Sequence, residues 1–427
     1  MSAQEVSPST KIFQEDTIRD GIMRVYHEDG KSLWFKGRMK AGMRKGPWIY
    51  YRKDGTVNTI VQYDNDTISG PTLYYDEQEI KVSETMFVNG IKEGHHNEFY
   101  NDGSVALSGF FSNGLKDSTW TEHLGYQRKG FEENYSKGKL HGKSVYYYDQ
   151  EYSYDRIQAI ENYRYGVKHG EWRFYYFNRQ LEKSFTYENG LLQGVYNEYY
   201  RNGKKKEEGN FSYDQREGKW LTFHEEGELA TIGRYFRDQK SGLWKYFSAT
   251  GTLRSEGRYK NDLRDGQWIY YYEDGTLSAV GSYRLGEKDG LWGLFYTNDQ
   301  LQQEQTWKNG SLMETSEFYS IKGEALEAGT LKEGSGTYFE YYPEGELYIS
   351  ANLVDGLFHG EYTIYYSTGN RQAQGQMAYG LQEGEWTYWH TNDKPESNGS
   401  FSQGEKVGYW NYYNGRGKLR EKINHDE

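Results

Sequence analysis

The sequence predicts an all-β protein, an elongated, twisted, single antiparallel sheet built from about 17 tandem β-hairpin repeats of about 24 residues. Three observations predict this fold class. One aromatic motif with a leading glycine recurs along almost the whole chain. The mean hydropathy is low, at -1.02, yet 18% of residues are aromatic, which a disordered chain would lack. Short aromatic runs alternate with glycine-containing turns, as in β-hairpins.

The recurring motif reads G-x-W-x-x-Y-Y-x-x-G, and its clearest copy runs from Gly266 to Gly275. We call the first glycine of each copy the anchor. The anchors lie at 21, 46, 70, 94, 118, 142, 170, 194, 218, 242, 266, 290, 313, 336, 360, 384 and 408. Ser118 and Met313 replace glycine in two copies, where we expect the sheet to bend. Twelve of the 16 intervals are 24 residues long, which indicates true repeats.

Three positions of each copy are expected to carry the fold: the anchor, the second residue after it and the fifth. The second residue is Trp in nine copies and Tyr in three, and the fifth is aromatic in every copy except at His123. Representative sets are Gly46, Trp48 and Tyr51; Gly170, Trp172 and Tyr175; Gly242, Trp244 and Phe247; Gly266, Trp268 and Tyr271; and Gly384, Trp386 and Trp389. Because strand side chains alternate, these aromatic residues should line both faces unless a bulge intervenes.

Two kinds of turn are expected to separate the strands. Asp54-Gly55 and Asp274-Gly275 mark one kind, and Asn89-Gly90 marks the other. Glycine and asparagine tolerate the positive φ that tight hairpin turns require. A single hairpin is marginal in water, so consecutive copies must pair edge to edge.

The domain organisation follows from the repeats. We expect a flexible N-terminal segment at 1–10, a continuous array over 11–417 and a charged C-terminal tail at 418–427. Four residues are added between anchors 142 and 170, which predicts an enlarged hairpin at 146–165. Its candidate partner-binding residues are Tyr148, Tyr152, Tyr154, Tyr163 and Tyr165. The alternative is a longer loop without a role, since loop insertions are well tolerated.

Several kinds of chemistry are disfavoured by the residues. The net charge of -12 argues against nucleic acid, no apolar run is long enough for membrane insertion, and the chain has no cysteine. Gly30-Lys31-Ser32 resembles the end of a phosphate-binding loop, but the required earlier glycine is Val25. His141, His169 and His359 precede anchors at about 10 Å per repeat, too far apart for one metal ion. We therefore expect no catalytic, cofactor-binding or metal site and no enzyme activity.

The motif resembles the MORN repeat variant, found in bacterial proteins labelled as YwqK-type toxin-antitoxin components. The residues that carry the resemblance are the anchors followed by Trp, as in Gly170-Glu-Trp172 and Gly384-Glu-Trp386, over about residues 11 to 417. The resemblance implies a β-hairpin array that serves as a scaffold or binding surface.

These observations favour a non-enzymatic scaffold for protein partners, as a subunit of a larger bacterial cell-envelope or secretion assembly. Two alternatives stay open: an aromatic surface that binds glycan chains, and an antitoxin-like neutraliser of a basic protein. We expect an exported, periplasmic or outer-membrane-associated protein whose signal peptide is missing from this chain, with the cytoplasm as the alternative.

Overall fold

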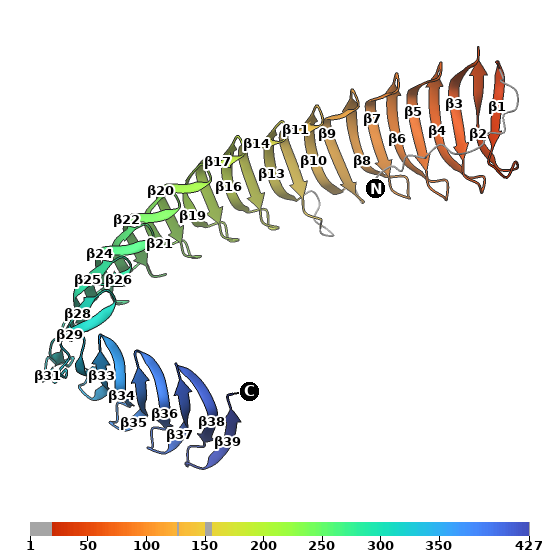
Figure 1. The fold of residues 1–427 in the computed structure, drawn as a ribbon. Coiled ribbons are helices and arrows are strands. Elements are labelled where there is room, and N and C mark those ends of the chain that lie inside the picture. Colours follow the sequence, from red (N-terminus) through yellow and green to blue (C-terminus); the bar gives the residue numbers. More distant parts are fainter. Residues whose placement is uncertain (1–18, 126–127, 150–155, 427) are drawn as a thin grey trace. The chain divides into compact units, whose positions relative to one another are not determined.

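The computed structural model describes residues 19–125, 128–149 and 156–426. Within them every regular element is a strand, and the strands form a 29-stranded, a 2-stranded and an 8-stranded sheet. Each strand pairs antiparallel with a neighbour in the chain, as β3 does with β4 and β4 with β5 (Figure 1). The predicted fold class, an antiparallel sheet of tandem β-hairpins, is confirmed.

The chain divides into two compact units. Unit 1 contains Met1–Lys204 and Phe211–Asp214, and unit 2 contains Lys205–Asn210 and Gln215–Glu427. The strands of unit 1 are β1 Gly21–Tyr26, β2 Leu33–Lys40, β3 Met43–Tyr51, β4 Val57–Asp64, β5 Thr67–Tyr75, β6 Lys81–Val88, β7 Ile91–Phe99, β8 Val105–Ser112, β9 Leu115–Leu124, β10 Arg128–Ser136, β11 Lys139–Leu140, β12 Gly142–Tyr147, β13 Ile157–Arg164, β14 Val167–Lys168, β15 Gly170–Tyr175, β16 Leu181–Glu188, β17 Leu191–Leu192 and β18 Gly194–Tyr199.

The remaining strands begin with β19, most of which belongs to unit 2. They are β19 Lys205–Ser212, β20 Gln215–Phe223, β21 Leu229–Phe236, β22 Gln239–Phe247, β23 Leu253–Lys260, β24 Leu263–Tyr271, β25 Leu277–Arg284, β26 Glu287–Lys288, β27 Gly290–Phe295, β28 Leu301–Lys308, β29 Ser311–Thr315, β30 Phe318–Tyr319, β31 Ala325–Leu326, β32 Gly336–Tyr341, β33 Leu347–Val354, β34 Leu357–Tyr365, β35 Arg371–Ala378, β36 Leu381–Trp389, β37 Pro395–Ser402, β38 Glu405–Tyr413 and β39 Leu419–Asn424.

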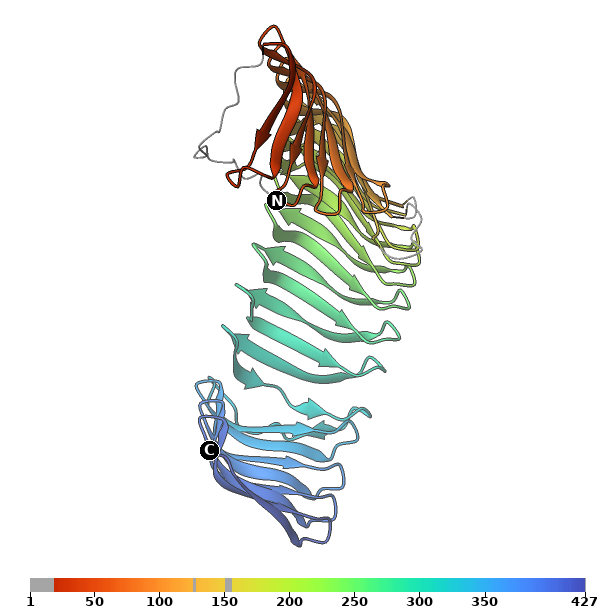
Figure 2. The same cartoon turned by 90° about the vertical axis from the view of Figure 1, so that its right-hand side faces the viewer.

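Two kinds of turn alternate along each unit. Between β3 and β4, Gly55 has a φ of 91° and its amide donates to the Arg52 carbonyl at 3.0 Å, which forms a turn closed by a glycine bulge. Between β4 and β5, Asn65 and Asp66 both have positive φ, at 48° and 65°, as in a type I′ turn. We call the two rows the long-loop edge and the tight-turn edge, and within each unit they lie at opposite ends of the strands (Figure 2).

The anchor glycine forms a β-bulge. Gly37 on β2 pairs with Trp48, but the next residue, Arg38, pairs with Lys45, so Gly46 and Pro47 have no partner residue on β2, although they pair with β4 on the other side. Gly46 has a φ of 76°, a region that only glycine adopts at low cost. The representative anchors Gly46, Gly170, Gly242, Gly266 and Gly384 all have φ between 67° and 86°.

The tryptophans form the core. Trp48, Trp172, Trp244, Trp268 and Trp386 are at most 4% exposed and lie on one side of the sheet, here called the tryptophan face. Cations lie over the rings of Trp48, Trp172, Trp244 and Trp268. The guanidinium carbon of Arg264, for example, lies 5.4 Å from the Trp268 ring and 4.8 Å from the Tyr283 ring. Such contacts contribute about 0.5–1 kcal/mol each at exposed sites, so the repeated stack replaces a thick aliphatic core.

The fifth residue of each copy lies on the opposite side, here called the back face. Tyr50 pairs with Thr59 and Tyr51 with Val57, so a second bulge separates the two tyrosines. The Lys36 ammonium on the back face lies 5.4 Å from the Tyr51 ring. Tyr175, Phe247, Tyr271 and Trp389 are half-buried at the same repeat position. Aromatic residues therefore line both faces, as the alternation predicts.

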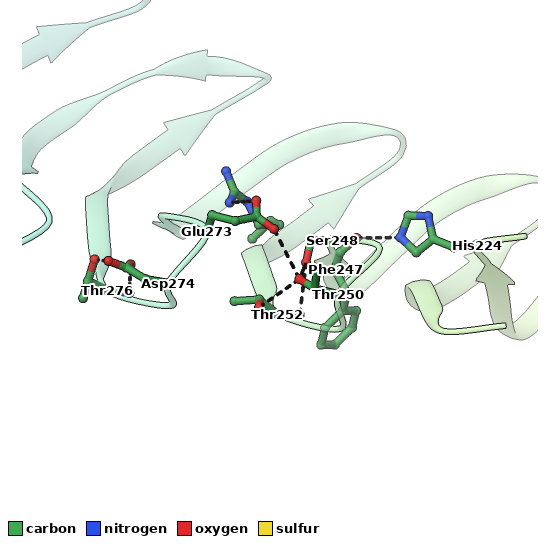
Figure 3. Close-up of polar contacts among 9 residues, drawn as sticks. His224, Phe247, Ser248, Thr250, Thr252, Glu273, Asp274 and Thr276 are labelled. Carbon is green, nitrogen blue, oxygen red and sulfur yellow. Dashed lines mark hydrogen bonds and ion pairs between the residues drawn. The ribbon is translucent and has the colours of Figure 1, made fainter. Parts of the chain in front are cut away.

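Polar side chains connect successive hairpins along the long-loop edge. Tyr272 donates its hydroxyl to the Phe295 carbonyl at 2.8 Å, and Tyr366 donates to the Trp389 carbonyl at 2.7 Å. In other copies histidine takes this position: His224 Nε2 lies 3.0 Å from the Phe247 carbonyl (Figure 3), and His27 Nε2 lies 3.3 Å from the Tyr51 carbonyl. These bonds fix one repeat to the next beyond the strand ladder.

Two expectations need correction. The array is interrupted at the Met313 copy, where β29 ends after five residues and the next large sheet begins only at β32. Met313 does not adopt the positive φ of an anchor, whereas Ser118 does, with a φ of 57°, and its sheet continues. The expected charged tail is wrong over most of its length, because Leu419–Asn424 form strand β39, which pairs with β38. The segment 1–10 lies outside the described residues.

Candidate functional site

The enlarged hairpin places its candidate tyrosines in three different environments. Tyr148 lies on the long-loop edge, where its hydroxyl donates to the Tyr175 carbonyl at 2.7 Å and its ring meets Phe177 edge-on at 5.3 Å. It therefore occupies the same position in its repeat as Tyr272 does, and it connects two repeats. Tyr152 and Tyr154 lie outside the described residues.

Tyr163 belongs to the tryptophan face. Its ring meets Trp172 edge-on at 5.3 Å, and its hydroxyl donates to Glu161 Oε2 at 2.6 Å. Burial raises the pKa of Tyr163, and the Glu161 carboxylate raises it further. Burial also raises the pKa of Glu161, although the hydrogen bond from Tyr163 opposes this shift. Both side chains are half-buried, so the pair packs with the tryptophan face.

Tyr165 lies on the tight-turn edge and is exposed. It is the first residue of the turn Tyr165–Gly166, with a φ of 50°, and 52% of its surface is accessible. Its ring stacks on His141 at 4.3 Å, and its amide donates to His141 Nδ1 at 3.3 Å. Of the described candidates, Tyr165 is the most exposed.

A second tyrosine on the same edge was not among the sequence candidates. Tyr213 opens the turn Tyr213–Asp214 with a φ of 49°, and it is 73% exposed. Asn65, Asn89, Asn113, Asn189, Asn261 and Asn309 occupy this turn position in other copies. Alignment of the copies would have shown a tyrosine where asparagine is usual. The copy of Tyr213 has the regular length, so the search for irregular copies missed it.

Two aliphatic residues lie between these tyrosines. Val167 is 46% exposed and Leu191 is 40% exposed. A Cβ placed on Gly190 would be 3.5 Å from Val167, so this side chain contacts the next turn. The Leu192 amide donates to Asp214 Oδ1 at 2.6 Å, which places Leu191 beside the turn of Tyr213. Tyr165, Val167, Leu191 and Tyr213 together form what we call the turn patch, all within unit 1.

Hydrogen bonds between repeats hold the turns of the patch in place. Gly190 donates its amide to the Lys168 carbonyl at 2.9 Å, and Asp214 donates to the Leu192 carbonyl at 3.1 Å. The Tyr213 amide donates to Gln193 Oε1 at 3.0 Å. Gln193 has the same position in its repeat as His141, which accepts the amide hydrogen bond of Tyr165. His359 Nδ1 accepts a hydrogen bond from the Tyr379 amide in the same way, at 3.5 Å. Two of the histidines that precede anchors, His141 and His359, therefore accept hydrogen bonds from backbone amides of the tight turns.

The described residues hold no group of three or more His, Asp or Glu side chains arranged to bind a metal ion. None of the described segments forms a helix with the length and hydropathy needed to cross a lipid bilayer.

Comparison with known proteins agrees with the repeat assignment. The model of the MORN repeat variant family matches residues 192–213, 240–261, 264–284 and 288–309. The resemblance inferred from the anchors and tryptophans is thereby confirmed for these four repeats. No curated protein matches the chain in sequence.

Solved structures match only weakly. The crystal structure of TcdB2-TccC3 shares 10% identity over 94% of this chain and 26% of that chain, with a TM-score of 0.15. The Tc holotoxin pore of Photorhabdus luminescens with a mutated TccC3 shares 10% identity over 94% of this chain and 27% of that chain, with a TM-score of 0.13. The chain spans about a quarter of the length of these chains. At such TM-scores the likeness supports no inference about this protein.

Proposed function

Because the chain carries repeats of the MORN variant family, we propose that it is a non-catalytic scaffold that binds a partner protein through the turn patch of unit 1. The observation that supports this proposal is the pair Tyr165 and Tyr213, which are bulky, exposed and held at positive φ. A bulky residue in this backbone region costs of the order of 1 kcal/mol, and asparagine would avoid most of that cost. Strain of this kind is concentrated at functional sites.

The composition of the patch suits a protein partner. Tyrosine is enriched among the residues that dominate binding energy at protein interfaces, because its ring buries a large area and loses little conformational freedom. Val167 and Leu191 add aliphatic area between the two rings. The two tyrosine turns are two repeats apart, which corresponds to about 20 Å, a distance that one protein partner can span.

Rigidity should contribute to affinity. The turns of the patch are fixed by amide hydrogen bonds to the preceding hairpin, so they should lose little conformational entropy when a partner binds. A preorganised surface binds more tightly for the same buried area.

The test compares the wild type with Tyr165→Asn/Tyr213→Asn. Each protein is crosslinked in native lysate, the captured protein is identified by mass spectrometry, and its affinity is then measured with both purified components. The double variant should bind at least about tenfold more weakly, since interface tyrosines commonly contribute more than 1 kcal/mol each. It should also melt at a higher temperature, because the backbone strain is relieved.

Leu285→Asn is the matched control. Leu285 is 71% exposed and opens a turn with a φ of 52°, but it belongs to unit 2. This variant should also gain stability while retaining the partner. Unchanged capture by the double tyrosine variant would contradict the proposal. A glycan-array signal that disappears in that variant, with no protein captured, would assign the patch to a glycan instead.

A further inference from the structure

A shallow hollow recurs on the back face, behind glycines that face a tryptophan. The first hollow, on β1–β3, has a volume of about 610 Å³ and includes Gly37. A second, on β7–β9, measures about 370 Å³ and includes Gly109, and a third, on β20–β22, measures about 300 Å³ and includes Gly233. All three occupy the same position in the repeat, so the residues around each glycine determine what a hollow can bind.

The first hollow is strongly basic. Its charged lining consists of Arg24, Lys36, Arg38, Lys40 and Lys45. Within the described part of the chain, no carboxylate lines it. Lys45 forms an ion pair with Asp64, whereas among the described residues the other four cations have no ion pair. The net charge of the protein is -12, so the positive charge of this hollow is opposite in sign to that of the whole chain. The fold itself does not require cations at these positions.

The cations are arranged at a cost to stability. Arg24 lies directly opposite Lys36 across β1 and β2, and Arg38 lies directly opposite Lys45 across β2 and β3. Like charges in directly opposed strand positions repel and destabilise a sheet. The equivalent residue to Lys36 in the copy of β23 is Glu256, which pairs with Lys245 at 2.8 Å. A pair of opposite charges therefore fits at this position of the repeat, but the first copy has two cations, Arg24 and Lys36, there instead.

We propose that this hollow binds an extended acidic peptide segment of a partner protein, which lies along β2. Lys36, Arg38 and Lys40 are alternate residues of one strand, so they project from the same face at intervals of about 6.8 Å. Alternate carboxylates of an extended peptide have the same spacing, so three acidic side chains can meet three cations in register. Arg24 and Lys45 flank this row on the neighbouring strands.

The surroundings favour a short peptide over a long polyanion. Residues 61–80 carry five Asp or Glu and no Lys or Arg. Asp64 and Asp66 pair with Lys45 and Arg44, but the three acidic residues at 76, 77 and 79 have no ion pair among the described residues, so a nucleic acid that continued past the hollow would meet repulsion. Ile22, Pro47 and Ile49 also line the hollow. These apolar side chains can contact the stems and backbone of a peptide, whereas phosphate groups gain nothing from them.

This site is separate from the turn patch, so the two proposals can fail independently. The test uses a fluorescein-labelled peptide in which three glutamates alternate with threonines, titrated by fluorescence anisotropy. The wild type should bind it, with affinity that decreases as salt rises. Lys36→Gln/Arg38→Gln should bind at least about tenfold more weakly, because two charge-assisted contacts are lost. The double variant should melt at an equal or higher temperature, since cross-strand repulsion is removed.

Arg258→Gln is the matched control. Arg258 follows Gly257 as Arg38 follows Gly37, and it is exposed. Its partner Leu243 on β22 corresponds to Ile22, the partner of Arg38 on β1, but the residue before the anchor is Asp265 where the first hollow has Lys45. This variant should bind the peptide like the wild type. No binding of the glutamate peptide by the wild type, or equal binding by Lys36→Gln/Arg38→Gln, would overturn the proposal. Pyrophosphate that binds more tightly than the peptide would overturn it in favour of a phosphate ligand.

Discussion

Trp268 lies flat over Gly257, its cross-strand partner, so closely that a Cβ placed on this glycine would be 2.2 Å from Trp268 Cδ2. The same contact joins Trp48 to Gly37, and six further tryptophans to glycines 11 residues earlier in the chain. The bulge at the anchor leaves the carbonyl of the residue after this glycine free of the ladder, and Trp268 Nε1 donates to it at Arg258 O, at 3.0 Å. Gly257 and Trp268 therefore pair in the strand ladder and pack in the core, and the indole of Trp268 satisfies the carbonyl that the bulge leaves unpaired.

Gly257→Ala should destabilise unit 2 by at least about 1–3 kcal/mol, because the added methyl group overlaps the buried indole and forces the ring to move. Gly257 has no positive φ, so the cost is steric and not conformational. Hydrogen–deuterium exchange should show faster opening of β23 and β24, since stability in repeat arrays is local. Gly415→Ala is the control, with nothing within 4 Å of its Cβ. Equal exchange in both variants would contradict the role of the contact.

Trp268→Phe should cost more stability than Trp48→Phe. Both substitutions remove the same ring volume, but Trp268 loses a hydrogen bond to the Arg258 carbonyl, whereas Trp48 Nε1 is buried without a partner among the described residues. A carbonyl left unsatisfied costs about 1–3 kcal/mol. Urea unfolding of the two variants, each compared with the wild type, measures this difference. Equal losses would mean that the indole hydrogen bond contributes nothing net.

The repeat period and the turns could be predicted because they depend on local chemistry. Asn89-Gly90 marks a type I′ turn from two residues alone, and the structure gives them φ of 51° and 79°. The contact of Trp268 with Gly257 could not be predicted in this way, since it joins residues on different strands and glycine carries no hydropathy signal. The position of the irregularity at Met313 could be located from the missing anchor glycine. The expected bend is in fact an end of the sheet, because the 29-stranded sheet stops at β29 and the next large sheet starts at β32.

The candidate site was predicted only in part. Tyr165 was selected because its hairpin is enlarged, and it is exposed. Tyr148 and Tyr163 were selected by the same criterion, yet they serve the long-loop edge and the core. Strand alternation alone could not separate these roles, because Tyr148 and Tyr165 lie just beyond the ends of β12 and β13, whereas Tyr163 lies within β13. Tyr213 could have been found by aligning the copies, since it stands at a turn position where asparagine is usual.

Ser118→Gly should stabilise unit 1 by about 0.5–1 kcal/mol, because Ser118 has a φ of 57° at an anchor where glycine carries no steric cost. The reverse change, Gly266→Ser, should cost about 1 kcal/mol for the same reason, since nothing lies within 4 Å of a Cβ at Gly266. The melting temperature of each variant, compared with that of the wild type, measures the two effects. Changes in melting temperature of the same sign in both variants would contradict this account of the anchor.

His96 belongs to an aromatic cluster on the tryptophan face. Its ring lies 5.5 Å from both Phe111 and Trp120, and its Nδ1 lies 2.8 Å from Thr85 Oγ1. Burial lowers the pKa of His96 below 6.5, and this outweighs the opposing effect of the Glu98 carboxylate; the charges of two lysines, at 92 and 116, lower it further. The folded protein therefore takes up this proton at a lower pH than the unfolded chain does.

His96→Gln should reduce the acid sensitivity of unit 1. Below pH 6.5 the unfolded chain binds a proton at this histidine that the folded protein does not, so stability present above that pH is lost as the pH falls through the window down to the lowered pKa. Glutamine cannot titrate, so melting temperatures measured from about pH 7.5 to about pH 5 should decline less in the variant than in the wild type. His95→Gln is the control, because His95 lies on the back face against Phe110. If the His96→Gln protein lost stability as steeply as the wild type, protonation of this ring would not be the cause.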